Sequence, residues 1–246
     1  MSALATRALL RILLPVAILY AVMVGLGLLI TKVWADSWPF TAEDGVNRAF
    51  AGHRTGGPDQ VTAFFTAVGN TPVIIAVTAV VAIVLRLALH RWREPLFLCA
   101  AVSAQAVVFL FTTLAIDRHR PAVKHMDQSP PTSSFPSGHT SAAVALYVGL
   151  ALVLAMLVRD QWLKAACWLL ILVPVAVGLS RLYRGMHHPS DVVASFLNGG
   201  TCIAVMARAI LDRGVSWSRA VPTRDGRTTT SGDVRAYGDL VSRKVP

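Results

Sequence analysis

Two histidines lie where polar loops meet long apolar runs, and the residues around them suit the binding of an anionic group. The first is His139, in the tetrapeptide Pro136-Ser137-Gly138-His139 directly before an apolar run that begins at Ala142. Serine is a favoured N-cap and glycine lets a ligand approach the backbone, so this junction predicts a helix start whose N–H groups bind an anion. Its position beside those groups makes His139 a candidate general acid.

The second histidine is His187, which is followed four residues later by Asp191. In a helical turn this spacing brings a carboxylate to one imidazole nitrogen and leaves the other nitrogen free to attack as a nucleophile. The competing interpretation is structural, with Asp191 capping the helix that begins nearby.

Two arginines complete the set of residues suited to a phosphoryl group. Arg120 precedes Pro121, and Arg181 follows Ser180. A guanidinium group binds two phosphate oxygens at once and keeps its charge, although an arginine in this setting also suits contact with lipid headgroups. Each motif lies at the end of a different apolar segment, so all of them can converge on one face of a membrane.

These motifs, taken in order, resemble the type 2 phosphatidic acid phosphatase family. The motifs are RP at 120–121, PSGH at 136–139 and SR-x5-H-x3-D at 180–191, and the resemblance covers Leu96 to about Ile210. The resemblance implies an all-α membrane protein with a helical core like that of the vanadium haloperoxidases. It also implies an enzyme that acts on a lipid phosphate.

The resemblance assigns roles to individual residues. It implies that His187 attacks phosphorus to form a phosphohistidine and that Asp191 orients His187, while protonated His139 serves the leaving oxygen. The rate should therefore peak between two apparent pKa values that belong to the coupled site. The residues expected to bind the substrate phosphate are Arg120, Ser137, Gly138 and Arg181.

One position departs from the family pattern. The family usually has a lysine seven positions before the arginine of the RP motif, and this chain has Thr113 there. Arg118 and Lys124 are the possible substitutes for the missing cation. Supporting rather than catalytic roles are expected for Arg118, His119, Tyr183, Arg184 and His188.

No metal or other cofactor is expected. His187, His188 and Asp191 are metal-ligand types, but arginines are interleaved with them. A site crowded with cations is poor for Mg²⁺ or Zn²⁺ and good for phosphate.

Composition indicates a membrane protein. Of the 246 residues 54% are hydrophobic, and the mean hydropathy is +0.57. The net charge of +10 does not indicate nucleic acid, because the basic residues lie at the ends of apolar runs and in the C-terminal tail. Cys99, Cys167 and Cys202 lie inside apolar segments and are interpreted as packing residues.

Six apolar segments are predicted to cross the bilayer, which needs about 20 residues per helix. They are Ile12–Ile30, Pro72–Leu89, Pro95 to about Ile116, His139 to about Val158, about Leu163–Leu179 and about Val192–Ile210. The alternative for the first segment is a signal peptide, but its apolar run exceeds the usual length of roughly 7–15 residues. Short interfacial helices are expected between the first two spans.

The chain divides into a membrane phosphatase domain over residues 1–211 and a basic tail over residues 212–246, expected to be disordered and cytoplasmic. Fifteen of the 23 Lys and Arg residues fall on the side of the termini and eight on the other. The positive-inside rule then puts both termini in the cytoplasm and the motif loops on the periplasmic or extracellular side of the plasma (inner) membrane.

The expected function is hydrolysis of a phosphate monoester or terminal diphosphate of a lipid at the outer face, with undecaprenyl or decaprenyl diphosphate favoured. Phosphatidate, phosphatidylglycerol phosphate and polyprenyl-phosphosugar phosphates stay open, because the motifs contact phosphate and not the lipid tail. The alternatives are a phosphotransferase and an inactive lipid-binding or transport protein of the same fold, which Thr113 supports best. The sequence leaves the oligomeric state open.

Overall fold

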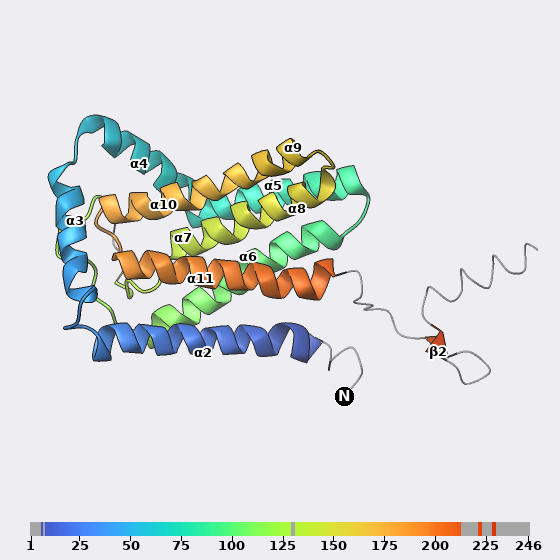
Figure 1. The fold of residues 1–246 in the computed structure, drawn as a ribbon, viewed down its shortest axis with the longest axis horizontal. Coiled ribbons are helices and arrows are strands. Elements are labelled where there is room, and N and C mark those ends of the chain that lie inside the picture. Colours follow the sequence, from blue (N-terminus) through green and yellow to red (C-terminus); the bar gives the residue numbers. More distant parts are fainter. Residues whose placement is uncertain (1–5, 7, 129–130, 213–220, 223–227, 230–246) are drawn as a thin grey trace, which may run out of the picture.

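Six helical spans form the molecule, as the sequence predicts (Figure 1). The structure is a computed structural model that describes residues 6, 8–128, 131–212, 221–222 and 228–229. The spans among these residues are Leu9–Val33, Thr71–Leu89, Arg93–Ala115, Gly138–Leu157, Gln161–Tyr183 and Pro189–Leu211. The predicted and observed ends differ by a few residues, because apolar runs continue into the interface before the backbone turns.

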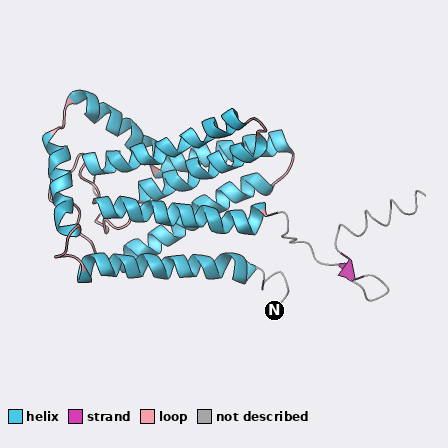
Figure 2. Cartoon of the chain, in the orientation of Figure 1, coloured by secondary structure: helices cyan, strands magenta, loops and turns pink. Residues whose placement is uncertain are grey.

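Several spans consist of α-helix joined to short π-helical or 3₁₀ turns, and Figure 2 shows that the described chain is almost wholly helical. The elements are η1 (Leu9–Leu13), α2 (Leu14–Leu28), η2 (Leu29–Val33), η3 (Phe40–Ala42), α3 (Glu43–Gly52), α4 (Gly56–Val68), α5 (Thr71–Leu89), α6 (Arg93–Ala115), α7 (Gly138–Ala143), η4 (Val144–Val148), α8 (Gly149–Leu157), α9 (Gln161–Trp168), η5 (Leu169–Ile171), α10 (Leu172–Tyr183), α11 (Pro189–Met206), η6 (Ala207–Leu211), β1 (Val221–Pro222) and β2 (Thr228–Thr229). The two strands pair with each other. The rest of the predicted basic tail lies outside the described residues.

Polar caps fix where the spans begin. The side chain of Asn70 accepts a hydrogen bond from the Thr71 N–H at the start of α5, and Asp160 accepts one from the Leu163 N–H at the start of α9. Ser137 caps α7, as its residue type predicts. These side chains satisfy N–H groups that the first helical turn leaves without a partner.

The centre of the bundle is formed by α6, by the span from α7 to α8, and by α11. In an 18-residue apolar stretch of each of these three spans 44–56% of the residues are buried, against 17% in the corresponding stretches of the first two spans. Buried apolar residues of α2, among them Leu19 and Met23, pack on this centre. Many apolar side chains outside this centre are exposed, among them Ile75, Leu87 and Leu172, as expected for helices whose surroundings are lipid.

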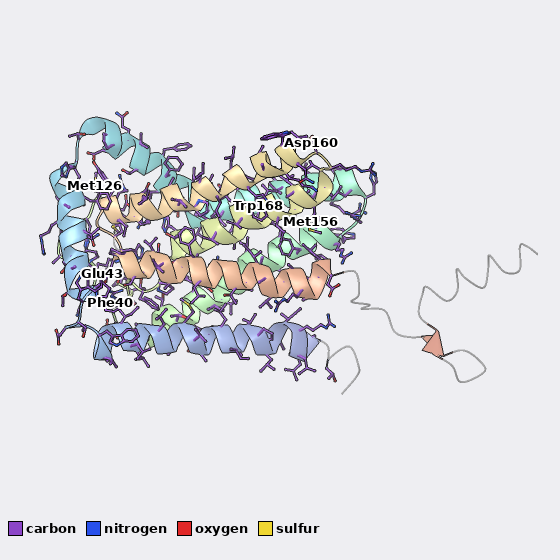
Figure 3. All side chains as sticks on the ribbon, viewed as in Figure 1. Phe40, Glu43, Met126, Met156, Asp160 and Trp168 are labelled. Atoms are coloured by element: carbon purple, nitrogen blue, oxygen red, sulfur yellow. The ribbon has the colours of Figure 1, made fainter. Side chains whose placement is uncertain are left out.

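The predicted interfacial helices are α3 and α4, which connect the first two spans. Figure 1 shows α3 lying across the ends of the spans rather than along them, and α4 leading back to α5. In Figure 3 Glu43 and Met126 lie at this end of the bundle, whereas Met156 and Asp160 lie toward the other. The two ends of the molecule are therefore unlike, and the loops that carry the motifs all belong to the end with α3.

Candidate functional site

The three predicted motifs meet around one cavity of about 540 Å³ at this end of the bundle. Its polar part is lined by Arg120, Gly138, His139, Arg181 and His187. Another wall is largely apolar and is built by α5 and α6, from Ile74, Ile75, Val102, Ala106, Phe109 and Leu110 together with the polar residues Thr71, Ser103 and Gln105. The cavity therefore joins a cationic, histidine-containing part to an apolar wall made by two membrane-spanning helices.

His187 lies at the buried side of this cavity, with 4% of its surface exposed. Its Nδ1 lies 2.7 Å from the carbonyl oxygen of Ser134. Because a carbonyl only accepts, Nδ1 carries the proton and Nε2 keeps its lone pair. Burial lowers the pKa of His187 to about 4, against the opposing effect of its interaction with Asp191. The imidazole is therefore neutral near pH 7.

Asp191 caps α11 and also lies near His187, so the structural and the catalytic interpretation of its spacing both hold in part. It is fully buried, and its Oδ2 accepts a hydrogen bond of 2.8 Å from the His188 N–H, within the capping box that starts α11. The same oxygen lies 3.7 Å from Nδ1 of His187. The carboxylate therefore lies near the imidazole, as its spacing predicts, while the shortest hydrogen bond of the imidazole goes to Ser134.

Arg118 lies on the far side of Asp191 and does not line the cavity. Its two Nη atoms bind Asp191 Oδ1 at 2.5 Å and Glu43 Oε2 at 2.6 Å. Glu43 also accepts a hydrogen bond of 2.7 Å from the Ser190 N–H. The structure therefore does not support Arg118 as a substitute for the missing lysine, because its guanidinium is taken up by two carboxylates.

Neither Lys124 nor Thr113 lines the cavity. The side chain of Lys124 is exposed, and its role as a substitute cation stays a prediction. Thr113 is buried within α6, and its hydroxyl donates to the carbonyl oxygen of Phe135 at 3.4 Å. The arginine side chains that line the cavity are Arg120 and Arg181.

Arg120 reaches the cavity from the loop after α6. Its Nη1 donates to the carbonyl oxygen of Met186 at 2.7 Å, and its buried Nε has no hydrogen-bond partner among the described residues. Burial lowers the pKa of Arg120, and the charge of Asp191 acts in the opposite direction. Arg181 comes from the end of α10, is 3% exposed, and likewise has a buried Nε without a partner in the described part of the chain.

Gly138 and His139 form the first turn of α7 and face the cavity, whereas Ser137 lies behind it. The Ser137 N–H donates to Ser195 Oγ at 2.8 Å, and the Ser137 hydroxyl lies 3.0 Å from Thr140 Oγ1. Ser137 thus joins α7 to α11, and the phosphate-binding role expected for it is not supported by its position. A Cβ at position 138 would lie 2.8 Å from the Phe109 ring, so glycine gives the cavity its width here.

Sequence reasoning assigned no role to four residues that hold this site. They are Glu43, Asn47, Asp127 and Ser134. Asn47 is fully buried and donates to the carbonyl oxygens of Leu182 and His187 at 3.2 and 3.0 Å. The sequence hints at these contacts only through the four-residue spacing of Glu43 and Asn47, which puts two polar residues on one face of α3. That spacing does not predict which residues they contact.

The family comparison matches residues 96–214 to the PAP2 superfamily. Two curated relatives are similar over shorter stretches. The undecaprenyl-diphosphatase of Sulfolobus acidocaldarius is 37% identical over 75 residues, 30% of this chain and 32% of that protein. The undecaprenyl-diphosphatase BcrC of Bacillus subtilis is 32% identical over 98 residues, 38% of this chain and 46% of that protein. The chain thus spans less than half the length of the curated relatives it matches.

Two solved structures share the fold. A PAP2-type phosphatidylglycerolphosphate phosphatase from Bacillus subtilis superposes with a TM-score of 0.70 at 20% identity, covering 83% of this chain and 98% of that one. LpxE from Aquifex aeolicus gives a TM-score of 0.54 at 23% identity, covering 69% of this chain and 97% of that one. At these identities the likeness concerns the helical architecture, which agrees with the all-α membrane fold expected from the sequence.

Proposed function

Residues 96–214 make this chain a member of the PAP2 superfamily, and from that membership we propose that the protein is a membrane phosphatase that removes phosphate from a lipid. The observation that carries the proposal is the cavity that joins His187, His139 and two arginines to an apolar wall of α5 and α6. A lipid phosphate needs both surroundings at once. Its head requires cations and a nucleophile, and its tail requires an apolar path from the bilayer.

In the proposed reaction, Nε2 of His187 attacks the terminal phosphorus, and the bond from phosphorus to the lipid-side oxygen breaks. His139 donates a proton to that leaving oxygen. Water then attacks the phosphohistidine, gives a proton to His139 and releases inorganic phosphate, which restores His187. The Ser134 carbonyl and Asp191 stabilise the proton on Nδ1 while the other nitrogen carries the phosphoryl group.

Arg120 and Arg181 are the proposed partners of the phosphoryl oxygens. Each has a buried Nε without a partner in the described part of the chain, so each has an N–H to offer to a bound phosphate. The first-turn N–H groups of Gly138 and His139 add the positive end of a helix. Together these donors stabilise the charge that develops on the equatorial oxygens during transfer, and no metal ion is required in this proposal.

Polyprenyl diphosphate is the proposed substrate. The proposal is supported by the two relatives named undecaprenyl-diphosphatase, and the apolar side chains that α5 and α6 contribute to the cavity suit a lipid tail. Phosphatidylglycerol phosphate is the second candidate, because the solved structure with the higher TM-score is a phosphatidylglycerolphosphate phosphatase. The experiment below compares the two directly.

We further propose that residues 1–211 form the catalytic unit in the plasma membrane, with cytoplasmic termini and the cavity on the outer side. The excess of Lys and Arg on the side of the termini supports this orientation. A carrier lipid that is recycled after use outside the cell would meet the enzyme on that side.

The test is phosphate release in detergent with EDTA present, from undecaprenyl diphosphate, phosphatidylglycerol phosphate and phosphatidate. We expect turnover of undecaprenyl diphosphate by the wild type and a loss of at least about a thousandfold in His187→Ala, because the nucleophile is gone. Exposed His53 is the matched control, and His53→Ala should retain activity. Rapid denaturation during turnover of ³²P-labelled substrate should trap an acid-labile phosphoprotein in the wild type and in His53→Ala but not in His187→Ala.

Two results would contradict the proposal. Equal turnover by His187→Ala and the wild type would exclude the phosphohistidine. Complete dependence on an added divalent ion would exclude the metal-independent mechanism.

A further inference from the structure

The nucleophile of the proposed reaction lies in a loop rather than in a helix. α10 ends at Tyr183, α11 begins at Pro189, and His187 lies between them. Its neighbours Arg184 and Met186 are buried, as His187 is. Buried carbonyl groups outside a helix need hydrogen-bond donors from other parts of the chain, because an unpaired one destabilises the fold. The position of His187 therefore depends on where those donors lie.

Side chains from two other segments supply such donors. Nη1 of Arg120 donates to the carbonyl oxygen of Met186 at 2.7 Å. Nδ2 of Asn47, in α3, donates to the carbonyl oxygen of Leu182 at 3.2 Å and to that of His187 at 3.0 Å. Of these two side chains, Asn47 is the one that binds the main chain of the nucleophile itself.

The carboxamide of Asn47 is committed to this loop. Asn47 is fully buried and does not line the cavity, so it cannot contact a substrate there. Its Oδ1 has no hydrogen-bond partner among the described residues. Because both neighbouring carbonyl oxygens are acceptors, only an N–H or O–H donor satisfies them, and a carboxylate of the same shape would repel both.

A second residue of α3 fixes the helix against the start of α11. Glu43, one turn before Asn47, accepts a hydrogen bond of 2.7 Å from the Ser190 N–H and one of 2.6 Å from Nη2 of Arg118. α3 thus binds the main chain at His187 and again three residues later. This helix lies across the ends of the spans, where it can bridge the ends of α10 and α11 (Figure 1).

We propose that Asn47 is a positioning residue that holds the main chain of His187 in place for its attack on phosphorus. The inference rests on the proposed function and adds to it a residue that acts through the nucleophile. The Ser134 carbonyl orients the imidazole, whereas Asn47 fixes the backbone from which the imidazole extends. A misplacement of about 1 Å can slow a reaction about a hundredfold, so Asn47 should affect the chemical step more than substrate binding.

The experiment compares three variants of the full chain in detergent by steady-state kinetics and thermal unfolding. Asn47→Leu keeps the approximate size and removes the donor, and Arg48→Ala is the control at an exposed neighbour on α3. In Asn47→Leu we expect kcat to fall at least about tenfold with KM within about threefold of the wild type. Arg48→Ala should match the wild type.

Asn47→Asp separates hydrogen bonding from packing. A carboxyl group donates a hydrogen bond only when it is protonated. The kcat of Asn47→Asp, relative to the wild type at the same pH, should therefore rise as the pH is lowered from 9 to 6. The same ratio for Asn47→Leu should stay flat.

Histidine-selective ¹⁵N NMR reports the position of His187 without any turnover. The ring signal of His187 should shift or broaden in Asn47→Leu and stay unchanged in Arg48→Ala, because only the first variant releases the main chain that carries the ring.

An unchanged kcat in Asn47→Leu would overturn the inference whatever its melting temperature, because Asn47 would then only stabilise the fold. Failure of both Asn47 variants to fold would also overturn it, since the contact would then hold the whole bundle rather than the nucleophile. The two proposals fail separately. A changed His187 signal in Asn47→Leu without turnover of any lipid by the wild type would contradict only the phosphatase. Turnover with kcat and the His187 signal both unchanged would contradict only the positioning role.

Discussion

At the scale of the residue, the chemistry depends on which nitrogen of His187 holds the proton. The short hydrogen bond of Nδ1 to the Ser134 carbonyl fixes the tautomer, and the 3.7 Å separation from Asp191 adds a negative charge behind it. A backbone carbonyl is a firm partner because it cannot be protonated or rotate away. Nε2 thus keeps its lone pair before any substrate binds, in a residue that lines the cavity.

The first prediction concerns the protonation of this histidine. Burial lowers the pKa of His187 from 6.5 to about 4, so the ring should stay neutral as the pH is lowered from 8 to about 5. In the unfolded chain the ring takes up its proton near 6.5, so its contribution to stability is lost as the pH falls from about 6.5 to about 4. Histidine-selective ¹⁵N NMR in detergent, assigned by the signal missing from His187→Ala, measures both the tautomer and the midpoint. A midpoint near 6.5 would contradict the buried, Ser134-bonded ring.

At the scale of the element, the position of the site depends on how closely two spans approach. A Cβ at Gly199 of α11 would lie 2.7 Å from Cβ of Val144 and 2.8 Å from the carbonyl oxygen of Ser141. Ser141 and Val144 belong to the span that begins with the cavity residues Gly138 and His139. Without a side chain at position 199, α11 packs directly on that span, as small residues permit in membrane bundles.

The second prediction tests this contact with two adjacent glycines. Gly199→Ala should lower the free energy of unfolding by about 1–3 kcal/mol and reduce activity, because backbone and side-chain atoms of the neighbouring span must move. Gly200→Ala is the control, since a Cβ there meets no atom within 4 Å. Thermal unfolding in detergent and phosphate release should separate the two variants. Equal melting temperatures would show that the bundle tolerates a wider spacing.

At the scale of the whole molecule, the cavity opens at the end of the bundle that carries α3 and α4. The turn between α8 and α9 lies toward the opposite end, where Asp160 is labelled in Figure 3. Because Lys and Arg residues are concentrated at that opposite end and in the tail, the charge distribution predicts which end faces the cytoplasm.

The third prediction tests this orientation in intact cells. In a background with the three native cysteines replaced, Gly52→Cys at the end of α3 and Arg159→Cys in the opposite turn provide exposed thiols. A membrane-impermeant maleimide should label Gly52→Cys in intact cells and Arg159→Cys only after lysis. The reverse pattern would put the cavity on the cytoplasmic side.

The sequence by itself determined the number of spans, the interfacial helices, the cap at Ser137 and the order of the motifs. Each of these follows from interactions between residues close in the chain: apolar runs long enough to cross a bilayer, a side chain that caps its own helix, and fixed spacings within one turn. Local patterns of this kind can be recognised in the sequence without knowledge of the tertiary structure. The sequence also predicted that four residues are neighbours, because each lies next to an end of a span on the same side of the membrane. They are His139, His187, Arg120 and Arg181.

Only the tertiary structure decided how the site is held. The bond from His187 to Ser134 joins residues 53 positions apart, that from Arg118 to Glu43 joins residues 75 apart, and that from Arg181 to Asp127 joins residues 54 apart. No local spacing links such pairs, because they meet only when separate spans pack. For the same reason the sequence could not show that Arg118 pairs with two carboxylates, or that neither Arg118 nor Lys124 lines the cavity.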